Sequence, residues 1–239
     1  MCVLFGKPPV KVEHAMKRVI RTFSNDEALV DERRKQIIKC ASTLFLKKGY
    51  DRTNMRDLGK ALGMTIGGLY HYIGSKDDIL HLVLDFTKAR NRITFQRIHK
   101  RVSKLRPTEA LQKSVQMYLE SVDEYQDMYN FLNHVIVILA PADRRIIFSN
   151  QTSETVYFER LLAKGIQTGE FKIDDPVIIA HDIVVMGNAW ANRRWFLRKR
   201  YTLKQYTRRH IELIMKQIGA DTSCAASSRN LRSKSHASA

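Results

Sequence analysis

The stretch TNMRDLGKALGMTIGGLYHYIGSK, which runs from Thr53 to Lys76, decides the fold of this chain. Its apolar residues recur at helical spacing on both sides of a glycine: Met55, Leu58 and Leu62 precede it, and Leu69 and Ile73 follow it. Gly63 can adopt the positive φ that ends a helix, and the Thr65 hydroxyl can cap the next one. The pattern therefore predicts a helix-turn-helix, with Met64 tucked into the core at the turn.

The outer face of the second helix has an unusual composition. Its first residues leave almost no side chain on the surface: Ile66, Gly67 and Gly68. The backbone there can approach a grooved partner closely, because glycine has no Cβ. Hydroxyl, imidazole and ammonium groups follow at Tyr70, His71, Tyr72 and Lys76. This combination suits a helix end that lies in the major groove of DNA and is held by phosphate contacts.

Residues 31–91 closely resemble the DNA-binding domain of TetR-type (tetracycline-repressor-like) transcriptional regulators. The matching pieces, in order, are RRKQIIKCASTLFLKKGY, TNMRDLGKALGMT, GGLYHYI and SKDDIL. They correspond to a first helix, a second helix, a recognition helix and the start of a fourth helix. Three residues depart from the usual pattern: Gly59 and Gly68 stand where alanine or another small residue is common, and Ile73 where phenylalanine is common. The two extra glycines are expected to loosen the motif by roughly 1 kcal/mol each relative to alanine.

The resemblance implies a role for each outward-facing residue of the motif. Base edges would be contacted by Arg56, Ile66, Gly67 and His71, and the sugar-phosphate backbone by Asn54, Thr65, Tyr70, Tyr72 and Lys76. Structural alternatives stay open for three of them. Tyr70 could pack beneath the helix pair, His71 could be a solvated surface residue, and Lys76 could belong to an ordinary helix start.

The charge distribution agrees with a nucleic-acid partner. The chain of 239 residues carries 41 Lys and Arg against 24 Asp and Glu, a net charge of +17. Residues 31–99 contribute 14 basic and 7 acidic side chains. Such an excess favours a polyanion, and the affinity for it should fall steeply with salt. Solubility alone would explain the total charge but not its concentration around the helix-turn-helix.

The chain as a whole predicts an all-α protein, because strand-like alternation is absent and glycines are few. The first helix of the motif would begin near Asn25, after a capping box formed by Ser24 and Glu27, and end at Gly49. Residues 12–23 have the pattern of one further, amphipathic helix before it. Beyond the motif, helices are expected at 75–103, 108–126, 127–139, 142–168, 175–199 and 202–219.

The helix at 75–103 would join two structural units. Four of its apolar residues are expected to face inward, namely Leu80, Leu84, Ile93 and Ile98, and its second half is strongly basic. We assign 1–30 to a basic extension, 31–91 to the DNA-binding domain, 92–220 to an effector-binding and dimerisation domain, and 221–239 to a disordered tail.

The last two helices are candidates for a dimer interface. The helix at 175–199 has a small-residue stripe, Ala180, Val184, Gly187 and Ala191, and a larger apolar one, Ile179, Ile183, Met186 and Trp190. The final helix adds Leu203, Tyr206, His210, Ile214 and Ile218. The family resemblance implies a homodimer through a four-helix bundle, and a two-fold protein would read a palindromic operator in double-stranded DNA. Packing within one chain is the alternative.

An effector pocket is expected in the C-terminal unit, where aromatic and thioether groups gather. The candidate residues are Tyr118, Tyr125, Tyr129, Phe131, His134, Met186, Trp190 and Arg194. The run AWANRRWFLRKR from Ala189 to Arg200 sets rings beside basic groups and could hold an anionic head group. It weakly resembles the corresponding segment of family members that sense acyl-coenzyme A thioesters. A solvated basic helix end is the alternative.

These observations predict a ligand-responsive repressor, released from its operator by a small apolar or amphipathic molecule such as an acyl-CoA or a fatty acid. A sequence-tolerant DNA-organising protein is the second hypothesis, and an enzyme that acts on the same ligand is the third. We expect no enzyme, because no nucleophile stands at motif spacing from a base, and we expect no cofactor and no metal site. Cys2, Cys40 and Cys224 show no metal or redox spacing, and Cys40 reads as a buried thiol. No apolar run approaches membrane length, which favours a cytoplasmic protein without a membrane partner.

Overall fold

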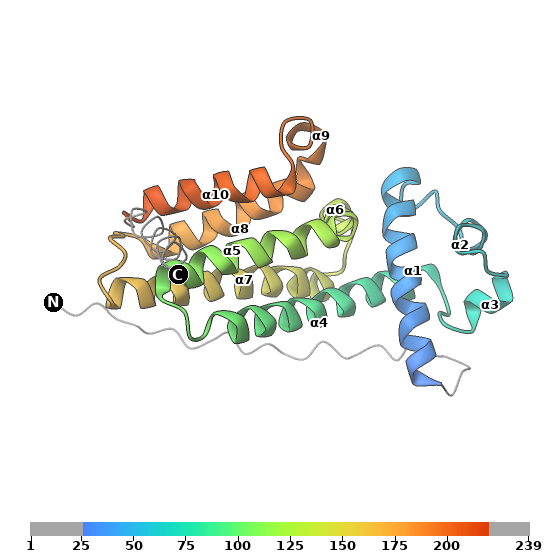
Figure 1. The fold of residues 1–239 in the computed structure, drawn as a ribbon. Coiled ribbons are helices and arrows are strands. Elements are labelled where there is room, and N and C mark those ends of the chain that lie inside the picture. Colours follow the sequence, from blue (N-terminus) through green and yellow to red (C-terminus); the bar gives the residue numbers. More distant parts are fainter. Residues whose placement is uncertain (1–25, 220–239) are drawn as a thin grey trace, which may run out of the picture.

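The computed structural model describes residues 26–219, and every regular element among them is an α-helix, which confirms the predicted all-α class. Ten helices follow one another: α1 (Glu27–Lys48), α2 (Met55–Leu62), α3 (Ile66–Tyr70), α4 (Lys76–Val102), α5 (Pro107–Glu124), α6 (Gln126–Val135), α7 (Pro141–Gln167), α8 (Pro176–Asn192), α9 (Arg194–Leu197) and α10 (Leu203–Gln217). The predicted helix at 12–23 and the predicted tail lie outside the described residues. Figure 1 shows a head made of α1 to α3 at one end and a bundle of the later helices at the other.

The first helix of the head begins at Glu27, two residues later than predicted. Its N-cap is Asp26, whose Oδ1 accepts a hydrogen bond from the Leu29 amide at 3.0 Å. A carboxylate caps a helix end and also complements its dipole. The helix stops at Gly49 as predicted, with φ of 92°.

The helix-turn-helix forms as the sequence predicts. Asn54 and Asp57 make a reciprocal capping box at the start of α2, and Gly63 ends that helix with φ of 65°. The Thr65 hydroxyl then accepts a hydrogen bond from the Gly68 amide at 3.0 Å. The α-helical part of α3 ends at Tyr70, three residues short of the predicted Ile73. The chain tightens there, since the Tyr72 amide donates to the Leu69 carbonyl three residues back.

The core of the head is closed by a helix from outside it. Leu58, Leu69 and Ile73 are fully buried, as predicted, whereas Met64 is only half-buried at the turn. Phe131 of α6 completes this core, with its ring centroid 5.0 Å from that of Phe45. Helix α6 therefore belongs to the packing of the head as much as to the bundle.

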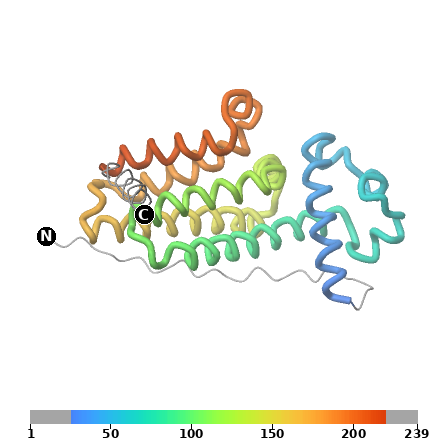
Figure 2. Tube along the Cα trace, viewed as in Figure 1, coloured from blue at the N-terminus to red at the C-terminus, as the bar shows by residue number. Residues whose placement is uncertain are grey.

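Helix α4 runs from the head into the bundle as one continuous rod (Figure 2). Ser75 caps it, as the predicted start at 75 requires. Leu84 and Ile98 are buried and Leu80 is half-buried, but Ile93 is 50% exposed, so its predicted inward position is wrong. Ile93 lies on the outer side of the rod, among the basic residues of its second half.

The bundle differs from the prediction mainly at the end of α8. A single helix was expected at 175–199, but α8 stops at Asn192, and Arg193 adopts φ of −115° and ψ of 26°. The four-residue α9 then turns away before α10 begins. The break redirects the basic side chains of 193–200, two of which bond acidic residues of α5 and α6.

The residues predicted for a dimer interface mostly fill the core of the chain itself. The stripe Ala180, Val184, Gly187 and Ala191 is buried, and so are Tyr206, His210, Ile214 and Ile218. A Cβ on Gly187 would lie 2.5 Å from the Tyr118 ring, so α5 approaches α8 closely at that residue. The apolar side chains that α8 and α10 leave exposed are Val177, Ile178, Val185, Met186 and Leu213.

Among residues 26–219, every helix is too short or too polar to span a lipid bilayer. Within the same range, His, Cys, Asp and Glu side chains do not gather in threes as a metal site would require. Cys40, on α1, is half-buried, and burial raises the pKa of its thiol.

Candidate nucleic-acid interface and its link to the C-terminal bundle

The N-terminal end of α3 presents an almost bare backbone. A Cβ on Gly67 would meet nothing within 4 Å, and Gly67 itself is exposed. A Cβ on Gly68 would lie 3.1 Å from the Thr65 hydroxyl, which is the cap of the helix. Ile66 is 39% exposed beside them. The structure thus brings the predicted close-approach surface to one solvent-facing edge of the head.

The side chains predicted around this edge fall into two groups. Tyr70 is 42% exposed, so it does not pack beneath the helix pair, and Arg56 and His71 are exposed as well. Tyr72 is half-buried in the core of the head, and its carbonyl accepts a hydrogen bond from Arg34 Nε at 3.2 Å. Tyr72 therefore has a packing role whether or not its hydroxyl also reaches a phosphate.

Lys76 is held by the protein. Its Nζ donates to the Tyr50 carbonyl at 2.9 Å and lies 4.3 Å from the centroid of the Tyr50 ring. Burial and the neighbouring Asp77 carboxylate, which accepts the Tyr50 hydroxyl proton at 2.5 Å, raise the pKa of Tyr50. Lys76 therefore takes part in an ordinary helix start, which was the structural alternative. To contact a phosphate as predicted, the Lys76 ammonium would have to do so while it also bonds the Tyr50 carbonyl.

Asn54 caps the start of α2, and Thr65 caps the start of α3. The Asn54 side-chain oxygen accepts from the Asp57 amide at 2.9 Å. Lys48 of α1 bonds the Asp57 carboxylate at 2.5 Å, and this bond is the main reason that the pKa of Asp57 is lowered. The caps fix the backbone that the predicted contacts require.

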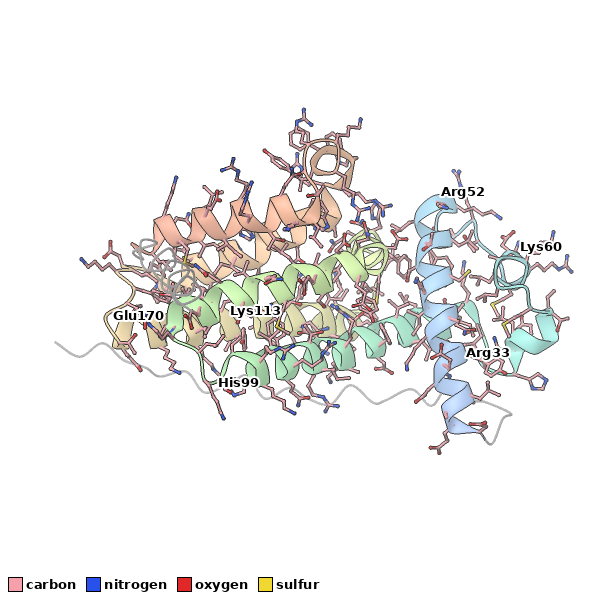
Figure 3. The ribbon with its side chains drawn as sticks, viewed as in Figure 1. Arg33, Arg52, Lys60, His99, Lys113 and Glu170 are labelled. Carbon is pink, nitrogen blue, oxygen red and sulfur yellow. The ribbon has the colours of Figure 1, made fainter. Side chains whose placement is uncertain are left out.

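Two arginines of α1 were missed by sequence reasoning. Arg33 lines a pocket of about 300 Å³ between α1 and the turn, together with Leu62, Gly63, Met64, Gly68, His71 and Tyr72. Figure 3 shows Arg33 on α1 at the head, whose other labelled cations include Arg52 and Lys60. The RRK run that carries Arg33 and Arg34 was read only as part of the first helix, whereas in the structure Arg33 lines this pocket and Arg34 Nε donates to the Tyr72 carbonyl.

A polar link connects the head to the bundle. Asp127 of α6 accepts the Thr43 hydroxyl proton at 2.8 Å and an Arg194 Nη1 proton at 2.5 Å. Burial raises the pKa of Asp127, but the bonds from Thr43 and Arg194 outweigh it and leave that pKa below its ordinary value. Asp127 thus joins α1, α6 and α9 through charge-assisted hydrogen bonds.

A second carboxylate organises the end of α8. Asp123 of α5 accepts from Trp190 Nε1 at 2.7 Å and from Arg198 at 2.7 Å. The Trp190 ring stacks on Tyr206, with the ring centroids 5.2 Å apart. Two cations of the AWANRRWFLRKR run, Arg194 and Arg198, therefore have carboxylate partners inside the protein, and their bonds are structural.

Three of the predicted effector residues come together around one buried cation. Tyr125 and Tyr129 flank the Arg90 guanidinium, whose Cζ lies 4.5 and 5.2 Å from the two ring centroids. Arg90 also donates to the Tyr129 hydroxyl at 2.6 Å. Nearby, Tyr118 donates to Glu154 at 2.9 Å. Burial raises the pKa of Glu154 to about 7, against the opposing effect of the Tyr118 bond and of Arg90.

The other five predicted effector residues do not join this cluster. Phe131 packs in the core of the head, and His134 is an exposed residue whose ring bonds the Asn130 carbonyl. Met186 is exposed on α8. Trp190 and Arg194 belong to the carboxylate links already described. Arg90, Asn91 and Glu154 were missed, although a charged residue at a core position of a helix is a recognisable signal.

Comparison with known proteins agrees with this architecture at both ends of the chain. Residues 37–83 match the model described as bacterial regulatory proteins, tetR family. Residues 104–219 match the model described as tetracyclin repressor-like, C-terminal domain. The chain is 28% identical over 201 residues to the HTH-type transcriptional regulator HbdR of Aromatoleum sp. (strain CIB), covering 82% of this chain and 85% of HbdR.

Solved structures show the same fold. The ketosteroid transcriptional regulator KstR2 of Mycobacterium tuberculosis superposes with a TM-score of 0.61 at 22% identity, covering 84% of this chain and 98% of KstR2. AibR, in complex with isovaleryl coenzyme A and operator DNA, gives a TM-score of 0.61 at 21% identity, covering 79% and 99%. The two family models together span more than half of the chain, on a fold built around a helix-turn-helix, and the chain therefore belongs to the TetR family of bacterial regulatory proteins.

Proposed function

We propose that this protein is a dimeric transcriptional repressor that leaves a palindromic operator when a small molecule binds its C-terminal bundle. The observation that carries the proposal is the contact of α1 with α6 through Thr43, Asp127 and Arg194. Because α1 supports the helix-turn-helix, a change in α6 or α9 is transmitted directly to the DNA-binding head. Helix α4 offers a second connection, since it begins at the head and ends in the bundle.

In this proposal the bare end of α3 lies in the major groove. Gly67 and Ile66 approach the base edges, with Arg56 and His71 beside them, and Tyr70 holds a phosphate. The remaining proposed backbone contacts are Asn54, Thr65, Gly68, Tyr72 and Lys76.

The effector-binding unit extends over residues 92–220 and the DNA-binding unit over 31–91. The effector is an apolar or amphipathic molecule, with acyl-CoA thioesters as the first class to test. AibR, which shares the fold, was solved with isovaleryl coenzyme A and operator DNA. The polar cluster of Arg90, Tyr129, Glu154 and Tyr118 lies on four helices of the bundle, α4 to α7, so it is well placed to sense a rearrangement of their packing. The protein is not an enzyme in this proposal, in line with the regulator names of its relatives.

A two-stage experiment tests the proposal. First, duplexes are selected from a random pool with the purified protein, and a palindrome with half-sites about 34 Å apart should be enriched. It should be bound at least about a thousandfold more tightly than random duplex. Second, isovaleryl-CoA and longer acyl-CoAs are titrated against the selected complex, with free coenzyme A as the control, and one acyl class should release the DNA.

The alternative outcomes separate the hypotheses. Enrichment of no sequence, with similar binding to all duplexes, would identify a sequence-tolerant DNA-organising protein. Tight binding to a palindrome that no acyl-CoA reverses would contradict the effector class but not the repressor. Hydrolysis of the thioester during the titration, followed by release of free thiol, would contradict the non-enzymatic assignment.

A further inference from the structure

The second half of α4 and the turn that follows it carry a concentration of positive charge that the functions above do not use. Residues 86–106 contain eight Lys and Arg and no Asp or Glu. Arg90 turns inward to bond Ser121 and Tyr129, and Arg106 lies 3.7 Å from Glu170. The other six are exposed and, within residues 26–219, form no ion pair: Lys88, Arg92, Arg97, Lys100, Arg101 and Lys104. We call these six residues the α4 ridge.

Some cations elsewhere in the described chain have carboxylate partners, and others have none. Arg194 and Arg198 bond Asp127 and Asp123, and Arg209 bonds Glu212. The α4 ridge is different, because its own helix supplies no acidic residue after Asp85. Six exposed like charges within 17 residues of chain, from Lys88 to Lys104, repel one another, which favours an external polyanion as their counter-charge.

The α4 ridge lies away from the proposed DNA-contacting end of α3 and from the proposed dimer face on α8 and α10. Figure 1 shows α4 along one edge of the bundle, with α9 and α10 on the opposite edge and α2 and α3 at the far end of the head. His99, in the middle of the ridge, projects from this edge away from the other helices (Figure 3). At 1.5 Å per residue, Lys88 lies about 18 Å and Arg101 about 38 Å along α4 from Lys76. Most of the ridge is therefore too distant for the duplex that α3 would contact, and a dimer formed through α8 and α10 leaves it uncovered.

The chemistry of the α4 ridge favours duplex DNA over other occupants. Five of the six cations extend over about 20 Å of α4, from Lys88 to Arg101, and a DNA strand presents a phosphate about every 3.4 Å along its axis. Ile93 is the one large apolar side chain exposed among them in the described structure, so the aromatic and aliphatic face of a membrane-binding helix is missing. Segments 1–25 and 220–239 each have more basic than acidic residues, and a second copy carries the same net +17 charge. Their net positive charge therefore disfavours the termini and a second copy as the counter-charge of the ridge.

We propose that the α4 ridge binds a second segment of duplex DNA, so that one dimer can hold two duplexes at once. The contact is made to phosphates and does not depend on sequence. It is an activity beyond operator release, because it uses a surface that neither the recognition helices nor the effector occupies.

A bridging assay tests this inference. A 30-bp random duplex is fixed on beads, loaded with protein at about 50 mM salt, washed, and offered a fluorescent random duplex of the same length. The test variant is K100Q/R101Q/K104Q, because glutamine keeps the length and helix propensity of these side chains. The matched control is K199Q/R200Q/K204Q, which removes the same charge from exposed positions at α9 and the start of α10.

Wild type and the control variant should capture the second duplex, and the ridge variant should capture at least tenfold less with the same protein load on the beads. Its binding to random duplex in solution should also lose salt dependence, by up to about 0.9 in the log-log slope for each phosphate contact removed. Equal loss in both variants would assign the effect to net charge and overturn the inference, as would full capture by the ridge variant. Ridge-dependent binding to phosphatidylglycerol vesicles without capture of a second duplex would also overturn it. Failure of wild type to load on the first duplex would instead contradict the DNA-binding function itself.

Discussion

Replacing Gly67 should make the protein more stable and its DNA binding weaker. A Cβ on Gly67 meets no atom within 4 Å, and the residue lies in the first turn of α3. Gly67→Ala therefore gains helix propensity without strain, by up to about 1 kcal/mol. For a chain of this size, that gain corresponds to a rise in melting temperature of about 2–4 °C.

The loss of affinity follows from the close approach of backbone to DNA. If Gly67 lies against the groove, each added heavy atom must displace the helix from the bases. Gly67→Ala should weaken binding to the selected palindrome, and Gly67→Gln should weaken it at least tenfold, which is about 1.4 kcal/mol. Fluorescence anisotropy at 150 mM salt measures the affinity, and a thermal unfolding scan measures the stability of the same samples.

Gly59 provides the matched control inside the same motif. A Cβ there would lie 2.9 Å from the Met64 carbonyl oxygen, which is backbone and cannot rotate away. Gly59→Ala should lower the melting temperature, because overpacking costs about 1–3 kcal/mol and exceeds the helix-propensity gain. Wild-type affinity in Gly67→Gln, or a lower melting temperature in Gly67→Ala, would refute the reasoning that an exposed, unobstructed backbone meets DNA at this residue.

Three further predictions concern the bundle. Asp127→Ala should lower the free energy of unfolding in urea by about 1–2 kcal/mol, a figure that already allows for solvent screening at the half-exposed Arg194. Adding Thr43→Val to this variant should cost little more, because the partner of the Thr43 hydroxyl is already gone. Additive losses would show that the two side chains are not linked. Folded Glu154 keeps its proton up to about pH 7, whereas its ordinary pKa is 4.5, so the folded state binds more protons than the unfolded state between these values. The free energy of unfolding should therefore fall by on the order of 2 kcal/mol as the pH rises through that window. His210 acts in the opposite direction, because burial lowers its pKa to about 4 and stability therefore falls as the pH drops below 6.5. To separate the two residues, urea unfolding of wild type and of Glu154→Gln is compared at pH 5 and 7.5. If the stability difference between the two pH values is the same in the variant as in wild type, the assignment to Glu154 is contradicted. The double variant Val185→Asp/Leu213→Asp places charges on the exposed apolar face of α8 and α10. It should sediment as a monomer and bind the palindrome at least about a hundredfold more weakly. The control Phe148→Asp, at an exposed position of α7, should change neither the oligomeric state nor the affinity.

The local part of the fold was predictable because its signals are local. Gly63, the Thr65 cap and the alternation of Leu58, Leu69 and Ile73 specify the helix-turn-helix within a short stretch of chain. The start of α1 was misplaced by two residues because two capping residues compete near it, and the carboxylate of Asp26 is the one used. Boundaries of this kind depend on side-chain geometry and are the least predictable feature of a helix.

The structure changes the expectation for Gly59. The sequence alone shows a glycine in a helix, which is unfavourable on propensity, but it does not show the Met64 carbonyl that comes within 2.9 Å of a Cβ at that residue. The same limit applies to the small-residue stripe of α8. Its pattern predicts a close helix neighbour, and the neighbour is α5 of the same chain, with Tyr118 against Gly187.

The effector site was the least predictable feature. Composition predicted that eight residues line one pocket, but the structure separates Phe131 and Trp190 from the tyrosines around Arg90. Which aromatic residue faces which neighbour depends on contacts between helices far apart in sequence, such as Asp123 with Trp190. A charged residue at a buried helix position, such as Arg90, is a better indicator of a polar cluster than aromatic content.

The insertion of α6 into the head limits where the chain can be cut. A fragment that ends after α4 would lack Met128, Phe131, Leu132 and Val135, and the apolar surface of α1 that they cover would face water. Chimaeras made by joining this recognition motif to another sensor therefore need a junction after Val135, or a foreign helix that supplies an equivalent of Phe131. Grafts joined inside α4 should aggregate even when the motif itself is intact.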